Sequence, residues 1–384
     1  MSSRRDFLKC SALLGAATTT FATNIVSKGD TLITNQKKTY TVNMKPCVVP
    51  LPLSPREIII PNVEGFKVLK GDFHLHTLFS DGQVMPSDRI IEAVDNGLDI
   101  IAITDHIEYR PFFSKKGRYK LNNELAENFN IWYDTAKPEA EKHHFLLVRG
   151  AEITKELPLG HFNVLFANDI NPIAAAVNDW RKMLKIAADQ GAFLLWNHPG
   201  YEIPADKPLQ FTELHEEAYQ QGLLHGIEIF NGWDYYPIVS DWCNERNLAL
   251  FANSDIHPSE LRCYGIKNMF RPITLVLAKE QTVESTKEAF FARRTIAWAA
   301  NILWGRDPWL PALFKASVNI KFSSSGTLEL TNTSSLPISV TIGGVAFNLP
   351  KDVKCQVYRA EGVKTLTVTN WMVATNKPLE IPLS

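Results

Sequence analysis

The amino-acid sequence predicts an α/β protein in which a parallel sheet or barrel is followed by a small all-β domain. Apolar, β-rich runs alternate repeatedly with helical segments between residues 66 and 305, an order typical of parallel sheets. Beyond about residue 315 the helical period disappears, and apolar residues alternate with Thr, Ser and other polar residues. A sandwich-like β-domain is therefore expected over residues 316–384.

The first predicted strand covers residues 66–73. A helix follows over residues 86–98, with Pro86 at its start and Gly97 at its end. Further strands are expected at 99–106, 145–154, 162–168, 192–198, 225–232, 248–257 and 271–278. Further helices are expected at 122–144, 172–191, 211–222, 235–247 and 282–294.

Composition excludes several classes of protein. Hydrophobic residues make up 45% and charged residues 21% of the 384 residues, which is ordinary for a soluble globular chain of two or three domains. The net charge of −1 offers no basic field for nucleic acid or for a membrane surface. The five cysteines form no C-x-x-C motif, so a zinc ribbon is not expected, and Cys243 with Cys263 is a candidate pair.

The N-terminus has the layout of a signal peptide. Arg4 and Arg5 precede a mild apolar run and small residues in "SSRRDFLKCSALLGAATTTFA", which resembles the bacterial twin-arginine export signal. Residues 1–22 would be removed near Ala22, and residues 23–65 would form a linker. The apolar run is too short for a stable membrane span. We expect export machinery to recognise the paired arginines, and a periplasmic or extracellular location in a bacterium. A basic tail is the alternative.

The conspicuous polar residues stand where predicted strands end. In "GDFHLHTLFSDG" His74 and His76 lie on one face of a strand, because a strand alternates its faces. Imidazole and carboxylate groups also close the later strands, and in parallel barrels the active site forms at that rim. The candidate metal ligands are His74, His76, Asp81, His106, Glu152, His161, His198, Asp255 and His257.

Imidazole and carboxylate ligands without thiolate suit Zn²⁺, Mn²⁺ or Fe²⁺. Nine candidates exceed the three or four ligands that one ion needs, so two or three ions are expected, with Glu152 as a bridge. Such ions lower the pKa of a bound water and neutralise charge on a transferred phosphoryl group. Among the other polar residues, we expect His225 at the surface and Glu228 in a structural role.

The motifs "DFHLHTLFSDG", "IAITDH", "GAEIT", "GH", "NHPG" and "SDIH" together resemble the PHP (polymerase and histidinol phosphatase) superfamily. The resemblance covers about residues 66–305. It implies a distorted (β/α)7 barrel with up to three metals at its C-terminal mouth, and phosphoesterase activity in most members. The first ion would be held by His74, His76, Glu152 and Asp255. The second would be held by Glu152, His161 and His198, and the third by Asp81, His106 and His257. The family often has His at the position of Asp81.

The expected function is metal-dependent hydrolysis of phosphoric esters, in which a metal-bridging hydroxide attacks phosphorus. Asp255 or His257 would pass a proton to the leaving group. Arg110, Lys155 and Arg262 are the candidate cations for a phosphate group.

Two alternatives remain. The same site could hydrolyse a carbamate, ester or amide, which an apolar, aromatic-lined mouth would favour over clustered Arg and Lys. The chain could also be a secreted binding protein whose metal site is structural and whose β-domain binds a glycan or a cell surface.

Overall fold

The structure is a computed structural model that describes residues 56–114, 117–120, 123–204, 206–267, 269–322, 327–358 and 363–383. The predicted signal peptide and most of the predicted linker lie outside these residues. Export therefore stays a prediction. None of the helices in the described part of the chain is long and apolar enough to cross a membrane. The fold below is that of one unit, Pro55–Ile203 with Leu209–Ser384.

Seven strands form a continuous run around the site. Their order is β10-β8-β7-β6-β5-β2-β1. An isolated parallel bridge between Leu75 and Ile256 joins the two ends of this run, so that the chain segments after β1 and β10 meet. The full (β/α)7 barrel of the family resemblance stays a prediction. The strands are β1 (Lys67–Asp72), β2 (Ile100–Ile103), β5 (Leu146–Ile153), β6 (Phe162–Leu165), β7 (Phe193–Trp196), β8 (Gly226–Asn231) and β10 (Ala249–Asn253).

One strand departs from the parallel arrangement. β6 runs antiparallel to both β5 and β7, whereas β1, β2 and β5 are parallel to one another, as are β7, β8 and β10. A parallel connection needs a crossover of a dozen or more residues. Only residues 154–161 separate β5 from β6, so the chain reverses direction there.

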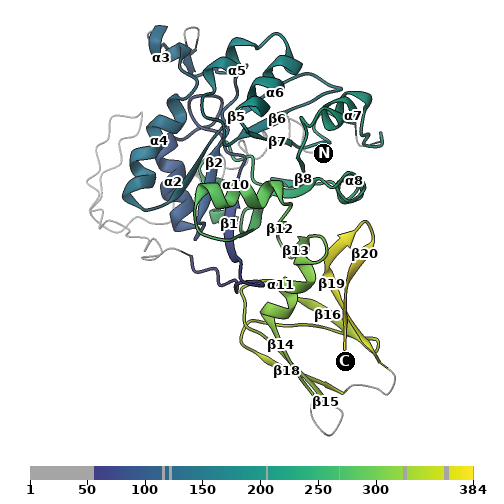
Figure 1. Cartoon of the computed structure of the whole chain (residues 1–384). Helices are drawn as coiled ribbons and strands as arrows, with labels where there is room; N and C mark the ends of the chain where they lie inside the picture. The colour runs from purple at the N-terminus through teal and green to yellow at the C-terminus, as the bar shows by residue number, and fades with distance from the viewer. Residues whose placement is uncertain are drawn as a thin grey trace, which may run out of the picture. The chain divides into compact units, whose positions relative to one another are not determined.

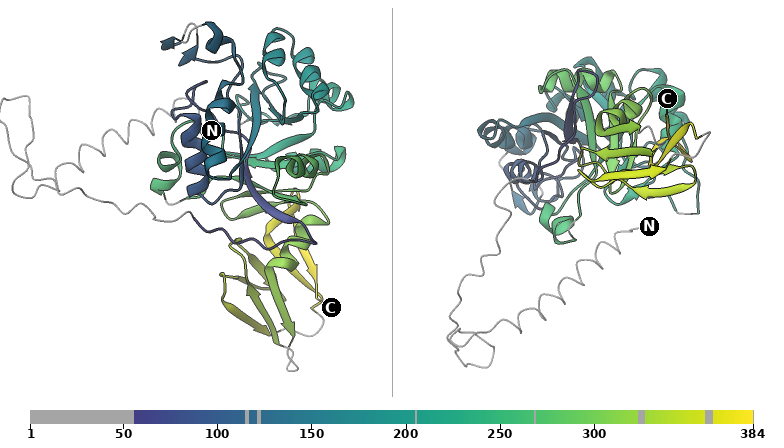
Figure 2. Two further views of the ribbon diagram at one scale, coloured as in Figure 1. Left: turned by 60° about the vertical axis from the view of Figure 1, so that its left-hand side comes forward. Right: turned by 90° about the horizontal axis from the view of Figure 1, so that it is seen from below.

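Helices pack around the outside of these strands (Figures 1 and 2). They are α2 (Pro86–Asp95), α3 (Asn123–Glu127), α4 (Ile131–Lys142), α5 (Asn171–Ala175), α6 (Trp180–Asp189), α7 (Glu213–Gln220), α8 (Val239–Arg246), α9 (Glu260–Cys263) and α10 (Val283–Phe291). Short elements are β3 (Phe113–Ser114), β4 (Tyr119–Lys120), β9 (Asp234–Tyr235) and the 3₁₀ turn Gly265–Lys267.

The prediction of one helix over residues 172–191 was wrong. The structure has α5 and α6 there, because Asp179 starts a new helix by accepting a hydrogen bond from the Lys182 amide at 3.2 Å. The predicted helix at 122–144 is likewise divided into α3 and α4. At Asp179, local capping thus interrupts a segment whose apolar spacing looks continuous.

The strands are apolar on both faces, as expected for buried parallel strands. Phe193 and Phe251 point into one cluster inside the run of strands, while their neighbours Leu194 and Leu250 point into the larger cluster under the helices. Phe290 of α10 packs into the inner cluster, with ring centroids 4.7 Å from Phe251. This packed interior leaves the carboxyl ends of the strands as the place for polar side chains.

The C-terminal part contains a separate small antiparallel sheet, as predicted. Its order is β14 (Val318–Phe322), β15 (Thr327–Asn332) and β18 (Lys354–Tyr358). The remaining strands extend the large sheet beyond β1, through β11 (Ile273–Ala278), β12 (Thr295–Ala299) and β13 (Ile302–Trp304). They are β16 (Ser339–Ile342), β17 (Val345–Asn348), β19 (Thr365–Ala374) and β20 (Lys377–Pro382). The predicted domain boundaries stay predictions.

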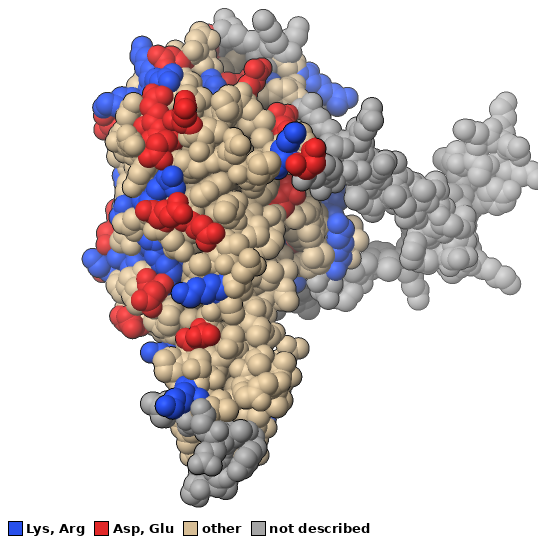
Figure 3. Space-filling view, turned by 90° about the vertical axis from the view of Figure 1, so that its right-hand side faces the viewer, with Lys and Arg blue, Asp and Glu red and all other residues tan. Residues whose placement is uncertain are grey.

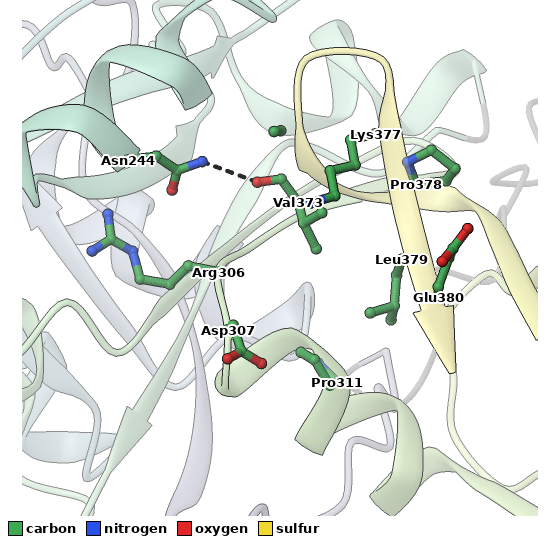
Figure 4. A pocket seen from close by; sticks show the side chains of 10 residues that line it. Asn244, Arg306, Asp307, Pro311, Val373, Lys377, Pro378, Leu379 and Glu380 are labelled. Carbon is green, nitrogen blue, oxygen red and sulfur yellow. Dashed lines mark hydrogen bonds between the residues drawn. The ribbon is translucent and has the colours of Figure 1, made fainter. Parts of the chain in front are cut away.

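Contacts between these strands and the α/β part were not predicted. Leu303 and Trp304 of β13 pair in parallel with Trp371 and Met372 of β19. The β19–β20 hairpin also borders a cavity of about 470 Å³ beside α8 and α11 (Trp309–Ser317) (Figure 4). There the Asn244 amide donates to the Val373 carbonyl at 3.1 Å.

Cys243, Cys263 and Cys355 are free thiols, so the suggested pairing of Cys243 with Cys263 was wrong. Cys243 is fully buried on α8, and its Sγ lies 3.6 Å from the Ala249 carbonyl oxygen. On the face drawn in Figure 3, charged side chains gather over the α/β part and are sparse over the C-terminal part.

Candidate metal centre

The first two histidines lie directly after β1 and share one face, as the strand period predicts. Both rings are fully buried. The Nε2 atoms of His74 and His76 lie 3.3 and 3.0 Å from Oδ1 of Asp255, which follows β10. The backbone holds the two segments together, because the Asp255 amide donates to the His74 carbonyl at 2.9 Å. Two distant segments thus present three ligand atoms to one point.

Glu152, at the end of β5, lies in the middle of the cluster and is fully buried. Its Oε1 lies 3.6 Å from His74 Nε2, 3.4 Å from His198 Nε2 and 3.0 Å from His161 Nδ1. Its Oε2 lies 3.4 Å from His76 Nε2. Because its two oxygens face different imidazoles, the carboxylate has the arrangement that a bridging ligand requires.

The Glu152 Oε2 atom also lies 2.8 Å from His106 Nδ1. The other nitrogen of this ring faces a second carboxylate, with His106 Nε2 3.5 Å from Asp81 Oδ1. The same Asp81 oxygen lies 3.1 Å from His257 Nε2 and 3.8 Å from His76 Nδ1. The Oδ1 atom of Asp81 therefore lies close to three imidazoles, although the PHP superfamily, which the sequence resembles, often has His at this position.

Four ligand atoms of this cluster are buried and make no hydrogen bond of suitable geometry, although each lies close to other candidate ligands: His74 Nε2, His76 Nε2, Glu152 Oε2 and Asp255 Oδ1. Buried polar atoms are rarely left unpaired, because each costs free energy. Divalent cations would satisfy all four, so the residues fit the expected metals. Three groups have mutually close ligand atoms: His76, Asp81, His106 and His257; His74, His76 and Asp255; and His74, Glu152 and His198.

These groups contain eight of the nine candidate ligands but divide them differently from the family resemblance, and the assignment of ligands to ions stays a prediction. His76 belongs to two of the groups, and His161 reaches the centre through its contact with Glu152. The number and identity of the ions stay predictions.

The electrostatics of the cluster keep its carboxylates ionised. Burial alone would raise the pKa of Glu152, but the positive charge of His106 and its neighbours holds it well below its usual range. Burial would lower the pKa of His106, yet attraction to Glu152 and Asp81 raises it to about 9. For His76, burial and repulsion from His257 and His106 lower the pKa to about 3. The ionised carboxylates and the neutral His76 imidazole are in the forms that bind cations, whereas His106 would release its proton when a cation binds.

The turn that carries Asp81 is held by a carboxylate that the sequence reasoning did not assign. Asp105 is fully buried and accepts hydrogen bonds from the Thr77 amide at 2.7 Å, from the Thr77 hydroxyl at 2.5 Å and from the Ser80 hydroxyl. Gly82 lies so close to His76 that an added Cβ would be 2.5 Å from the His76 carbonyl. Only glycine fits at this position.

Glu228 orients His74, which agrees with its predicted structural role. Its Oε1 lies 2.9 Å from His74 Nδ1, and its Oε2 accepts from the His198 amide at 2.8 Å. A carboxylate at the far nitrogen fixes the ring of a metal-binding histidine and strengthens it as a ligand. Similarly, Asn197 donates to Glu152 Oε1 at 2.9 Å.

Arg89 of α2 is a further positioning residue that the sequence reasoning missed. Its side chain is fully buried. Its guanidinium donates to the His76 carbonyl at 3.0 Å, and to the carbonyls of Ile256, His257 and Pro258 at 2.9, 2.8 and 2.9 Å. Arg89 therefore ties the His76 segment to the His257 segment. Its place inside a helix gave no sign of this role.

Two ligand candidates adopt backbone conformations that are costly for residues other than glycine. Asp255 has φ of 50° and His198 has φ of 28°. Such conformations persist where the surrounding structure enforces them, and they concentrate at functional sites. The hydrogen bonds from the His198 amide to Glu228 and from the Asp255 amide to the His74 carbonyl supply that enforcement.

All three predicted cations have partners in the protein, but only the partner of Lys155 carries a charge. Arg110 donates to the carbonyls of Phe79 and Ala126 at 3.1 and 3.0 Å. Lys155 pairs with Glu108 at 2.7 Å. Arg262 is exposed, and its Nη1 lies 3.3 Å from Gln83 Oε1. Only Arg262 of the three is thus placed at the surface without a charged partner among the described residues.

The prediction that His225 lies at the surface was wrong. The ring is half-buried, lies 5.3 Å from the Phe193 ring, and accepts a hydrogen bond from the Leu194 amide at 2.9 Å. His215 is buried in the first turn of α7, where its Nε2 lies 2.8 Å from the Leu159 carbonyl oxygen. Both histidines stabilise the fold apart from the metal cluster.

Comparisons with known proteins agree with this description. The chain is 34% identical, with a TM-score of 0.79, to the crystal structure of a two-domain protein containing a predicted PHP-like metal-dependent phosphoesterase from Bacteroides vulgatus. The match covers 86% of this chain and 98% of that one. At this identity and coverage, the relative shows the family of this chain. The chain belongs to the family of two-domain proteins that contain a PHP-like domain.

Other similarities are weaker. An uncharacterised protein of Methanocaldococcus jannaschii is 26% identical over 209 residues, which is 50% of this chain and 83% of that protein. A putative metal-dependent phosphoesterase from Bifidobacterium adolescentis is 14% identical over 58% of this chain and 96% of that one, with a TM-score of 0.40, too low to support an argument. No family model matches the chain.

Proposed function

We propose that this protein hydrolyses phosphoric esters with the help of two or three divalent ions held by the cluster. The observation that supports this most is the convergence of buried, unpaired ligand atoms from His74, His76, Glu152 and Asp255. One cation needs three or four ligands, and the larger set around Glu152 favours more than one. Zn²⁺, Mn²⁺ and Fe²⁺ suit these ligands.

When bound, such ions lower the pKa of water and neutralise charge on the phosphoryl group. In the overall reaction the water oxygen bonds to phosphorus, the bond from phosphorus to the alcohol oxygen breaks, and that oxygen takes up a proton. Glu228 and Asn197 keep His74 and Glu152 in place throughout. The His257 side chain is 26% exposed, so a substrate oxygen can approach it, and we retain it as the candidate for delivering that proton. Asp255 is a weaker candidate, because burial would raise its pKa but the neighbouring imidazoles lower it and keep the carboxylate ionised.

The test combines metal quantification with a panel of substrates. Purified protein should contain two or three ions per chain and should hydrolyse nitrophenyl phosphate or its diester. His76→Ala should lower turnover by about 100-fold or more, because it removes a ligand. The matched control is His143→Ala at the exposed end of α4, which should retain activity. Full activity of His76→Ala would contradict the assignment. At most one ion and no hydrolysis would favour the metal-containing binding protein instead.

A second candidate function uses the same metal site to hydrolyse a carbamate, a carboxylic ester or an amide instead of a phosphoric ester. The observation that favours it is the position of the cations. Arg110 and Lys155 are engaged with protein groups, so they add little positive charge for a phosphate. Faster hydrolysis of nitrophenyl acetate than of nitrophenyl phosphate, lost in His76→Ala, would select this candidate.

We also propose that the protein is exported across a bacterial membrane, on the grounds of the sequence around Arg4 and Arg5. Replacing both arginines by lysine should retain the precursor in the cytoplasm. Immunoblots of cell fractions would detect this, and unchanged periplasmic or extracellular protein would rule out the twin-arginine route.

A further inference from the structure

We infer that the substrate carries a planar, apolar group, such as an aromatic ring, next to the bond that is cut. This rests on the proposed hydrolase function. Large apolar side chains are exposed on segments that follow the strands. They include Tyr109, Leu157, Tyr201 and Trp233 on loops, and Leu261 and Ile266 on α9 and the 3₁₀ turn after it, each 43% to 62% exposed. Exposed apolar surface can mark a binding site, and the rings of Tyr109 and Tyr201 lie against candidate ligands.

Tyr201 lies against the ligands themselves. Its ring centroid is 5.0 Å from that of His198 and 5.5 Å from that of His161. At the same time, the residue is 43% exposed. The Tyr201 amide donates to the His198 carbonyl at 2.8 Å, so the turn that bears a ligand also sets the position of this ring. A group bound at the cluster would therefore meet the Tyr201 ring.

Tyr109 occupies the corresponding position after β2. Its ring centroid is 6.2 Å from that of His106, and the residue is 46% exposed. The loop is anchored on both sides of it, because the Ile107 amide donates to the Glu152 carbonyl at 2.9 Å and Arg110 donates to the Phe79 carbonyl. Anchored rings lose little entropy when they bind a ligand, which favours affinity.

A third exposed ring follows β8. Trp233 is 53% exposed, its ring lies 5.1 Å from that of Tyr264, and the Lys267 ammonium lies 4.6 Å above it. The Gly232 amide donates to the Asn253 carbonyl at 2.9 Å, which ties this loop to the end of β10. Two loops therefore present aromatic rings against candidate ligands, and the Trp233 loop is tied to the end of the strand that precedes Asp255.

The charges point the same way. With Arg110 and Lys155 engaged elsewhere, Arg262 is the remaining candidate cation, whereas the Tyr109 and Tyr201 rings lie against the ligands and can meet the part of the substrate that does not react. Offset or edge-to-face contact between aromatic rings adds to the gain from apolar burial. The protein should therefore distinguish between substrates mainly by the organic group of the ester.

The experiment compares two phosphonates that cannot be hydrolysed, phenylphosphonate and methylphosphonate, on the metal-loaded protein by calorimetry. We expect phenylphosphonate to bind about tenfold more tightly. Tyr201→Ala should remove most of that difference and Tyr201→Phe should retain it, because the ring is what matters. Val345→Ala, at a 53% exposed apolar residue of β17, is the matched control and should change neither affinity.

Kinetics supply a second measurement. Tyr201→Ala and Tyr109→Ala should each raise KM for phenyl phosphate about 3- to 10-fold relative to ethyl phosphate, with the ratio to wild type cancelling the intrinsic reactivity of each ester. Equal binding of the two phosphonates, or equal loss of both in Tyr201→Ala, would overturn the inference. So would a dimer in sedimentation that Tyr201→Ala dissociates, because the rings would then serve self-association. Failure to hydrolyse any ester, with the phosphonate preference intact, would reject the proposed function but leave the aromatic subsite standing.

Discussion

Replacing Arg89 by methionine should weaken both the fold and the metal centre. The variant keeps a similar volume but loses hydrogen bonds to the carbonyls of His76, Ile256, His257 and Pro258. It also leaves Glu92, 2.7 Å from the guanidinium in the wild type, without its partner.

Hydrogen bonds to charged groups contribute about 1.5–3 kcal/mol each but are not additive. Breaking a buried ion pair on one side costs about 3–5 kcal/mol. We therefore expect unfolding free energy to fall by roughly 4 kcal/mol, out of the roughly 5–15 kcal/mol typical of domains.

The metal measurement separates positioning from general stability. Arg89 connects the segments of His76 and His257, which belong to one candidate ion group, so metal affinity there should fall about 10- to 100-fold. The matched control is Arg294→Met. Arg294 is also buried, donates to the Leu277 carbonyl at 2.9 Å and pairs with a glutamate, but it contacts none of the candidate ligands.

Denaturant unfolding of the metal-free proteins and metal titration of the folded proteins give the two quantities. Arg294→Met should lose stability and keep its metal affinity. Wild-type metal affinity in Arg89→Met, or an equal loss in both variants, would refute the reasoning.

Further changes test other parts of the site and fold. Glu228→Gln should lower metal affinity about tenfold with a small change in Tm, because His74 loses an ionised partner; unchanged affinity in a metal titration would contradict this. Gly82→Ala should cost about 1–3 kcal/mol in denaturant unfolding, because the new methyl group would collide with the His76 backbone. Removing the metals with a chelator should lower Tm, since ligands that bind only the folded state stabilise it by about 2.7 kcal/mol at 100 times Kd; an unchanged Tm would argue against ions in the cluster. Stability should also fall as the pH drops from about 6.5 to 4, because burial lowers the pKa of His215 to about 4 and the unfolded chain takes up the proton first. His215 alone would account for up to about 3 kcal/mol at pH 4, and a Tm difference between pH 7 and 5 that persists unchanged in His215→Phe would exclude it as the cause.

Much of the site could be predicted because its ligands follow a local rule. Each strand is an apolar run of a few residues, and polar side chains stand close to its carboxyl end. His74, His198 and Asp255 lie two residues after β1, β7 and β10, and Glu152 is the penultimate residue of β5. The structure brings these four side chains together. Their identity as metal ligands stays a prediction, supported by the unpaired buried atoms.

The residues that hold those ligands in place could not be predicted in the same way. Arg89 lies in the middle of α2, and its partners at Ile256–Pro258 are more than 160 positions away. Asp105 stands next to a predicted ligand but bonds to Thr77 and Ser80. Such roles depend on which segments come into contact in the fold. The apolar periodicity of one segment does not indicate which distant segments will contact it.

Residue types and their spacing were sufficient to establish an α/β chain with polar strand ends and a β-rich C-terminus, because helix and strand periods are local properties. The reversal of β6, the pairing of β19 with β13 and the contacts of the Tyr109 and Tyr201 rings with candidate ligands arose from folding. Each of these joins segments far apart in the chain, and their hydrogen bonds and packing exist only after the intervening residues have been buried.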